Sequence, residues 1–294
     1  MTGAFMYNRR LRSDEIETWV NYCCPEGIDR ERFGEYAKEF MQMEDSMYFI
    51  SSVEDRFVGG TAVYRDRVRL AMALVYLSLE KKYRESVVAH LIKSSLPFFK
   101  SMSIRNVDAI VNPSDNITSL PFPLSTELAD WTTKSLETLK FEKIDTVYKI
   151  RFENIKRPEE KVSLFWDSEC NYEGSRKLMW DLRKETGLNF SQVWLLRDIM
   201  YRYNSFHTVT LDDEVAACAG LIKLGRIGII APLFVHSQVS LTDSLGILID
   251  QLGGVKTIEM PLVGKGQIRV IKFLEDILQT DAKIQELLLY RKNL

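Results

Sequence analysis

A run of basic residues in the first half of the chain follows an apolar segment and could bind a diphosphate. The apolar segment covers residues 70–79, and Lys81, Lys82 and Arg84 follow it where a helical pattern begins. The first turn of a helix exposes backbone N–H groups without acceptors and carries a partial positive charge, which suits a phosphate. Glu85 opposes this because it places a carboxylate in the same turn. The alternative interpretation is an ordinary amphipathic helix with a solvated basic start.

The corresponding part of the second half has no such basic helix start. The loop at 235–243 contains no glycine, lysine or arginine, and Asp243 would repel a phosphate. Glycines at 253–254 and 264–266 flank a predicted strand, but their spacing is not that of a P-loop, so turns are favoured. We therefore expect one diphosphate site per chain, in the first half.

Other classes of site and partner find little support. The four cysteines form no CxxC pair and no cluster with the three histidines, so neither a metal site nor a disulfide framework is predicted. No Ser-His-Asp or Cys-His pairing suggests a nucleophile. The net charge is −2 and the basic residues are dispersed, which argues against a nucleic-acid partner. Without a signal peptide or a bilayer-length apolar segment, we expect a cytoplasmic protein that does not bind a membrane.

The elements that would position these residues occur twice in one order. In each half, two helical patterns precede three strand-like segments, a helix, a strand, a further helix and a last strand. The polar segment 153–161 contains a proline and is the predicted linker. The sequence therefore predicts two domains, at 1–153 and 160–294, although any mixed chain of helices and strands could be divided in this way.

Some of these elements can be placed more closely. Acidic turns at Glu54–Asp55 and Asp212–Asp213 join strand-like segments at corresponding places in the two halves. Helices are expected at 125–139 in the first half and at 242–252 in the second half.

The first half resembles the GNAT superfamily of N-acetyltransferases. In that family an apolar strand leads into a helix with the pattern Q/R-x-x-G-x-G/A, whose backbone amides hold the pyrophosphate of acetyl-coenzyme A. Arg84 matches the first position and Ala89 the last, whereas Val87 stands at the central glycine. Residues 111–116 are similar to the family's strand-to-asparagine segment, and 139–141 to the Gly-Phe before its final hairpin, with lysine in place of glycine.

The resemblance implies an α+β fold of two tandem GNAT-like domains, each with a mixed, mostly antiparallel sheet flanked by helices. It also implies acetyl-coenzyme A as a co-substrate bound by the first domain, with the second domain degenerate and shaping the acceptor site. The Val87 side chain is expected to hinder close approach of a phosphate. The residues expected to bind the cofactor are Leu77, Leu79, Arg84, Glu85, Ser86, Val87, Val88 and Ala89.

Transfer of an acetyl group to an amine requires an oriented thioester, a stabilised oxyanion and removal of a proton. The family commonly uses a backbone amide of the central strand, a carboxylate or water as base, and a tyrosine of a later helix as acid. The strand at 70–79 contains no carboxylate, and Trp131 stands where the tyrosine is sought. The candidate catalytic residues are therefore Tyr76, Asp108 and Asn116, each of which could instead be structural.

Three hypotheses follow for the function. The leading one is an N-acetyltransferase that uses acetyl-coenzyme A and direct attack by an amine on a small molecule or a protein. A catalytically degenerate tandem protein that binds a ligand or a partner is the second. The third is a structural interaction module in which the GNAT resemblance is accidental.

Overall fold

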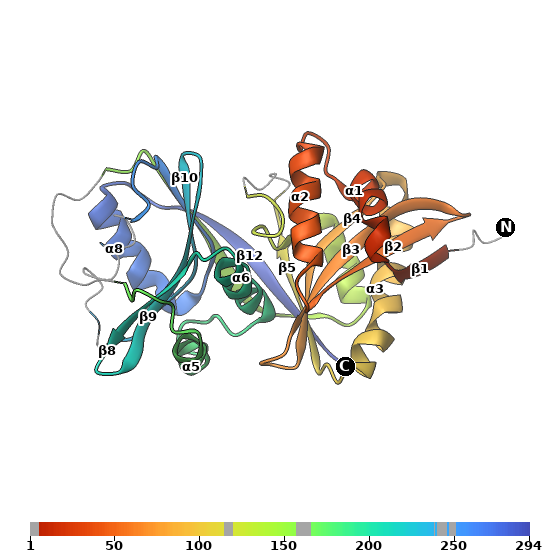
Figure 1. Ribbon diagram of the computed structural model, residues 1–294. Helices are drawn as coiled ribbons and strands as arrows, with labels where there is room; N and C mark the ends of the chain where they lie inside the picture. Colours follow the sequence, from red (N-terminus) through yellow and green to blue (C-terminus); the bar gives the residue numbers. More distant parts are fainter. Residues whose placement is uncertain (1–5, 115–119, 157–165, 238, 240–245, 247–250) are drawn as a thin grey trace. The chain divides into compact units, whose positions relative to one another are not determined.

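The structure is a computed structural model that describes residues 6–114, 120–156, 166–237, 239, 246 and 251–294 (Figure 1). The chain forms two compact units. Unit 1 consists of Met1–Asp145 together with Leu287–Leu294, and unit 2 consists of Thr146–Glu286.

Along its main strand order, the sheet of unit 1 is antiparallel except for one neighbouring pair of strands. The order is β1-β2-β3-β4-β5-β12, in which β4 and β5 are parallel and all other neighbours are antiparallel. The strands are β1 (Met6–Arg10), β2 (Ser46–Val53), β3 (Arg56–Asp66), β4 (Ala71–Leu79), β5 (Asn106–Asn112) and the end of β12 (Lys283–Asn293).

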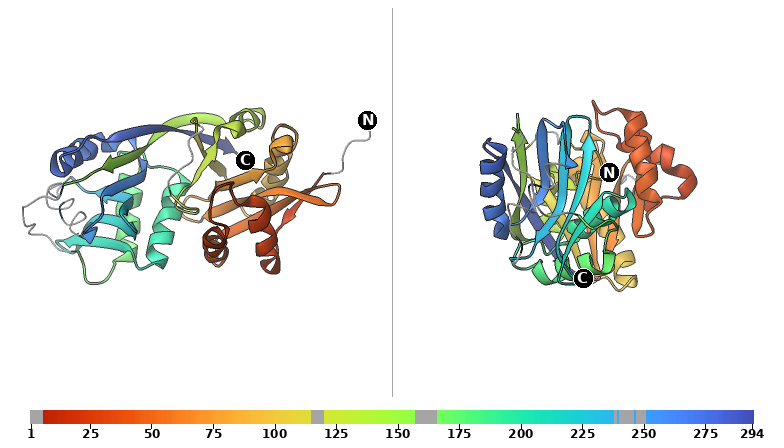
Figure 2. Two further views of the ribbon diagram at one scale, coloured as in Figure 1. Left: turned by 90° about the horizontal axis from the view of Figure 1, so that it is seen from above. Right: turned by 60° about the vertical axis from the view of Figure 1, so that its left-hand side comes forward.

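Helices cover both faces of this sheet (Figure 2). Helices α1 (Ile16–Cys23) and α2 (Arg30–Met41) lie on one face, and α3 (Arg84–Ser101) packs on the other. The division follows from the alternation of β2, because Met47 and Phe49 join the core around α3 while the ring of Tyr48 makes edge contacts with aromatic rings of α1 and α2.

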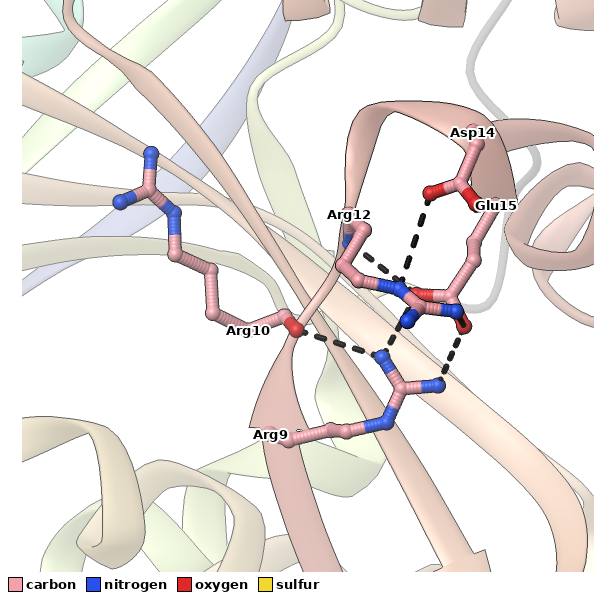
Figure 3. Close-up of polar contacts among 5 residues, drawn as sticks. All are labelled: Arg9, Arg10, Arg12, Asp14 and Glu15. Atoms are coloured by element: carbon pink, nitrogen blue, oxygen red, sulfur yellow. Dashed lines mark hydrogen bonds and ion pairs between the residues drawn. The ribbon is translucent and has the colours of Figure 1, made fainter.

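A polar cluster fixes the junction between β1 and the first helix (Figure 3). Arg9 donates from Nη1 and Nη2 to the two carboxylate oxygens of Glu15, both at 2.6 Å. Glu15, in the turn η1 (Ser13–Glu15), also accepts from the backbone N–H of Arg12 at 3.1 Å. The side chain of Arg10 points away from this cluster (Figure 3).

Unit 2 has a sheet of the same kind, with the order β7-β11-β10-β9-β8. Only β10 and β11 are parallel. The strands are β8 (Phe206–Leu211), β9 (Glu214–Leu224), β10 (Ile227–Val235), β11 (Thr257–Val263) and the second part of β7 (Glu142–Glu153). The helices are α5 (Tyr172–Leu182), α6 (Ser191–Arg202) and α8 (Ile268–Leu278). The helix expected at 242–252 falls mostly outside the described residues.

Matching hairpins support the predicted repeat. Glu54 and Asp55 join β2 to β3, and Asp212 and Asp213 join β8 to β9. All four residues have positive φ, between 49° and 64°. Two successive residues with positive φ form the turn whose twist matches that of the flanking strands. The acidic turns found in the sequence thus occupy the same place in both units.

The last strand of each half crosses from one unit to the other. β7 begins in unit 1 and pairs with β11 in unit 2, whereas β12 begins in unit 2 and pairs with β5 in unit 1. For this reason the units differ from the expected ranges 1–153 and 160–294. The division falls between Asp145 and Thr146, within β7, and the last eight residues, Leu287–Leu294, return to unit 1.

The expected helix at 125–139 is only partly present, which corrects the sequence prediction. Its first part is a strand, β6 (Glu127–Ala129), followed by the turn η3 (Asp130–Thr132) and the short helix α4 (Thr133–Thr138). β6 pairs in parallel with β5. Glutamate, leucine and alanine favour helices, so the pairing overrides the local preference by satisfying backbone groups at the edge of β5.

Candidate active site

The two parallel strands of unit 1 separate halfway along their length. β4 and β5 pair from Ala71 and Asn106 to Leu74 and Ala109, and no further. The separation begins at a bulge, because Val75 is an extra residue between the pairs that Leu74 and Tyr76 form with β3. A bulge bends its strand and increases the local twist. Beyond Leu74, β4 therefore has one edge paired with β3 and one edge that β5 has left.

A basic turn follows at the end of β4. The turn η2 (Lys81–Tyr83) leads without a break into α3, which begins at Arg84. Lys82 lies 3.6 Å from the carboxylate of Glu80, which also accepts from Arg56 at 2.8 Å. The leading N–H groups of such a turn have no acceptor inside the helix. The turn therefore combines backbone donors with the positive charge expected for a diphosphate site.

Arg84 contacts residues on both sides of it. Its Nε donates to the carbonyl oxygen of Leu79 at 3.4 Å, and its guanidinium lies 4.7 Å from the ring centre of Trp131. Trp131 belongs to η3, which directly follows β6. A cation over the face of an indole is attracted by the ring's negative face. In the sequence, Trp131 stands out only because it occupies the place of the family's tyrosine, and no pattern there indicates this contact.

The other expected cofactor residues divide between the core and the surface. Glu85 is exposed and Ala89 is half-buried, whereas Leu77, Leu79, Val87 and Val88 are buried in the core of unit 1. The side chain of Ser86 is outside the described set. Val87 is 1% exposed, so its side chain points into the core. The expectation that this side chain hinders a phosphate is therefore wrong.

β6 lies along the edge of β5 that faces β4. β12 pairs with β5 from Asn106 to Val111, which occupies one edge of that strand. β6 pairs with β5 from Ile110 to Asn112, so it takes the other edge directly after the last pair with β4. It is also in contact with β4. The space that opens between the two separating strands thus contains a segment of the chain itself.

Tyr76 points to the α1 and α2 side of the sheet. Its hydroxyl donates to the carbonyl oxygen of Cys23, and its ring contacts those of Trp19, Phe33 and Phe122. Burial raises the pKa of the Tyr76 hydroxyl. The group therefore stays protonated and is a donor rather than a base.

Asp108 is completely buried in an ion-pair network. Its Oδ2 accepts from Arg69 at 2.9 Å and its Oδ1 accepts from Arg291 of β12 at 2.6 Å. Both carboxylate oxygens are thus engaged by guanidinium donors. These contacts favour a structural role over the expected catalytic one. Asn116, the third catalytic candidate, lies outside the described residues.

Two parallel strands also separate in unit 2, but a different group lies beside the separation. β10 and β11 pair only as far as Ile229 and Glu259, and β10 also has a bulge, between Ile230 and Leu233. Beyond it, the side chain of Gln267 donates to the carbonyl oxygen of Leu233 at 2.7 Å and accepts from the N–H of Gly264 at 3.1 Å. Gln267 is buried, and no feature of the sequence indicated this role.

The remaining motifs are structural where the structure describes them. A side chain at position 264 or 266 would collide with the backbone of Glu185 and Thr186, so these glycines permit a close approach of two segments. Among the described residues, no group of three or more His, Cys, Asp or Glu could hold a metal. None of the helices in the described part of the chain combines the length and apolar content that a membrane crossing needs.

No protein-family model and no curated protein sequence matches the chain. Solved structures do match it over nearly its whole length. A putative acetyltransferase from Pyrococcus horikoshii aligns with a TM-score of 0.63 at 15% identity, covering 100% of this chain and 90% of that one. A tandem GNAT protein from the clavulanic acid biosynthesis pathway aligns with a TM-score of 0.62 at 9% identity, covering 98% of both chains. A GCN5-related N-acetyltransferase from Sphaerobacter thermophilus aligns with a TM-score of 0.58 at 11% identity, covering 98% of this chain and 95% of that one.

These alignments show the fold. The chain has two tandem GNAT-like units, and the expected α+β class with mixed, mostly antiparallel sheets is confirmed. At such low identity the likeness does not extend to substrates, because one fold carries many functions and function depends on the site.

Proposed function

We propose that the chain is an N-acetyltransferase that uses acetyl-coenzyme A and holds its diphosphate at the η2–α3 turn of unit 1. The observation that carries the proposal is the place of this turn. A helix start with Lys81, Lys82 and Arg84 directly follows a strand that has just separated from its parallel neighbour. Donors and positive charge at this point suit the diphosphate, and the edge of β4 that β5 has left suits the arm that joins it to the thioester.

The reaction proposed is direct attack of an amine nitrogen on the thioester carbonyl carbon. The new C–N bond forms, the C–S bond breaks, the thiolate of coenzyme A leaves, and the amine proton passes to water. Backbone N–H groups of β4 beyond Leu74 that point away from β3 are the proposed donors to the oxyanion. Tyr76 and Asp108 are not assigned to proton transfer because both are held in other contacts. The acceptor is an amine of a small molecule or of a protein.

Unit 2 is proposed to bind no cofactor. Gln267 bonds to Leu233 of β10 beside the corresponding opening, and the sequence of the loop at 235–243 contains no lysine or arginine. One molecule of acetyl-coenzyme A per chain follows from this contrast.

A second candidate function is binding without catalysis. The observation that favours it is β6, which lies where the arm of the cofactor would contact β4. In that case the chain would bind a ligand or partner through the GNAT fold and would transfer no acetyl group. An acetylation assay with a panel of amines, monitored through the release of free thiol from coenzyme A, separates the two functions. Only an acetyltransferase releases the thiol in an amine-dependent reaction.

Calorimetric titration with acetyl-coenzyme A tests the proposed site. We expect saturation near one equivalent, and we expect Arg84→Ala to weaken binding by about tenfold, because it removes a charged donor worth about 1.5 kcal/mol. Ala89→Glu should weaken it further by placing a carboxylate beside the diphosphate.

Arg183→Ala is the matched control, since its guanidinium also lies over a tryptophan, 3.6 Å from the ring centre of Trp180, but in unit 2. Binding that is unchanged in Arg84→Ala, or a stoichiometry near two, contradicts the proposed site.

A further inference from the structure

The segment Glu127–Thr132, here called the β6–η3 segment, contacts both elements that the proposed cofactor would use. Its strand lies along the edge of β5 and against β4, and its turn places Trp131 over Arg84. The arm of acetyl-coenzyme A can pair with β4 only along the edge that β5 has left, because β3 covers the other edge as far as Leu79. The segment pairs with β5 and also lies against β4, so the segment and the cofactor arm meet at the same edge of β4 and at the same arginine.

We infer that the β6–η3 segment occupies the acyl-coenzyme A site of unit 1 and must leave β5 before the arm of the cofactor can bind. This inference rests on the proposed function and adds to it a regulation of the same site. The chain carries its own competitor for the cofactor, and the site opens only in the fraction of molecules in which the segment has moved.

The local sequence makes the segment easy to displace. β6 has only three residues, Glu-Leu-Ala, all of which favour a helix over a strand. It precedes η3 and α4, so a segment released from β5 can extend that helical region in its N-terminal direction. The opposing contact is Leu128, which is 1% exposed in the core of unit 1. Thr132 is also buried and Trp131 packs against the same core, so strand pairing and these side chains hold a segment whose own preference is different.

Occupation by the segment lowers the apparent affinity for the cofactor. If only a fraction of molecules has the segment displaced, the measured Kd is the intrinsic Kd divided by that fraction. A change that weakens the segment's contacts without touching the diphosphate site should therefore tighten binding. An ordinary substitution beside a ligand site would weaken binding or leave it unchanged.

Hydrogen exchange of the wild-type chain, with and without saturating coenzyme A, tests the displacement directly. We expect coenzyme A to slow exchange at the start of α3, in residues 81–88. We expect it to speed exchange in residues 127–132, because their pairing with β5 is lost. Faster exchange on ligand binding is the specific sign of a displaced segment.

Two variants test the competition through the affinity for coenzyme A. Trp131→Ala removes the contact with Arg84, and we expect it to tighten binding about two- to fivefold. Its control is Trp180→Ala, which removes the equivalent contact with Arg183 in unit 2. Leu128→Ala loosens β6, and its control is Leu136→Ala, a buried residue of α4 in the same core. Both controls should bind as the wild type does.

The outcomes separate this inference from the proposed function. Slower exchange in residues 127–132 on addition of coenzyme A overturns the inference and leaves the proposed function intact. The inference is also overturned, with the proposed function intact, if Trp131→Ala and Leu128→Ala bind coenzyme A no more tightly than their controls do. If neither the wild type nor any variant binds coenzyme A, the proposed function is wrong and the inference fails with it. Binding by the two variants alone supports both.

Discussion

The two units share one plan and differ in what lies between their separating strands. In each unit two parallel strands separate at a bulge, after Leu74 in β4 and after Ile229 in β10. In unit 1 the opening contains the strand β6, and in unit 2 the side chain of Gln267 bonds to Leu233 beyond the bulge of β10. The same feature of the fold is thus completed by main chain in one copy and by a side chain in the other.

This difference indicates which opening can receive a ligand. A short strand can leave as a unit and be replaced by another extended chain with amide groups, which repeats its type of contact. Gln267 satisfies Leu233 and Gly264 from within the core, and a ligand that displaced it would leave buried polar groups without partners. Under the proposed function, we therefore expect unit 1 to be the copy in which exchange with a ligand has a low cost.

The units agree in how the crossing strands are held. Asp108 of β5 lies opposite Arg291 of β12, and Glu259 of β11 lies opposite Arg151 of β7. Arg291 donates to Asp108 at 2.6 Å, and Arg151 donates to Glu259 at 3.3 Å. Both carboxylates are completely buried. In each sheet, a buried acid is thus paired with an arginine of the crossing strand.

The largest expected effect tests this shared feature. Asp108→Ala and Glu259→Ala should each lower the free energy of unfolding by about 3 to 5 kcal/mol. Each removes the carboxylate that holds a largely buried cation, Arg69 at 2.9 Å from Asp108 and Lys149 at 3.1 Å from Glu259. Denaturant midpoints of the two variants should fall by similar amounts. Glu286→Ala, an exposed acid of β12, is the control and should change stability by less than about 0.5 kcal/mol. A loss below about 1 kcal/mol in one unit only would break the equivalence of the two strand pairs.

An intermediate effect on stability is expected for Gln267, beside the separating strands of unit 2. Gln267→Leu leaves the carbonyl of Leu233 and the N–H of Gly264 without their partner and should cost about 1 to 3 kcal/mol of stability. The number of coenzyme A molecules bound per chain should stay at one in calorimetry. Gln251→Leu, at an exposed position, is the control. A second equivalent bound by Gln267→Leu would show that both openings are ligand sites.

The smallest effect concerns the start of unit 1. The hydrogen bonds from Arg9 lower the pKa of Glu15 to about 2, against burial, which raises it. A lowered pKa in the folded state stabilises the fold above the ordinary value of 4.5, and this contribution is lost as the pH falls from 4.5 towards 2.

Thermal melts of Glu15→Gln should therefore lie below those of the wild type near pH 6 and approach them near pH 2. Glu17→Gln, whose carboxylate lies 3.2 Å from the exposed Lys38, is the control, because a surface pair of this kind contributes little. A difference between Glu15→Gln and the wild type that is constant with pH would contradict the role given to Arg9.

The sequence by itself determined the local elements and their repetition. Acidic turns at Glu54–Asp55 and Asp212–Asp213, alternating strands and the helix that begins at Arg84 all depend on neighbouring residues, so their patterns are visible along the chain. The repeated order of elements and the basic turn at the end of β4 follow from these patterns, whereas the tandem GNAT-like fold was implied by the family resemblance of the first half.

Only the tertiary structure decided which strands pair and what fills each opening. The sequence pattern of a strand such as β7 does not indicate which strand it pairs with. Its pairing with β11 brings Arg151 to Glu259, which is 108 residues away in the sequence. From the sequence, Asp108 was a candidate for catalysis, but in the fold its carboxylate accepts a hydrogen bond from Arg291, 183 residues away. Likewise, Glu127–Ala129 favours a helix locally and becomes a strand because β5 offers an unpaired edge. Such contacts depend on backbone groups and charges that only the fold brings together.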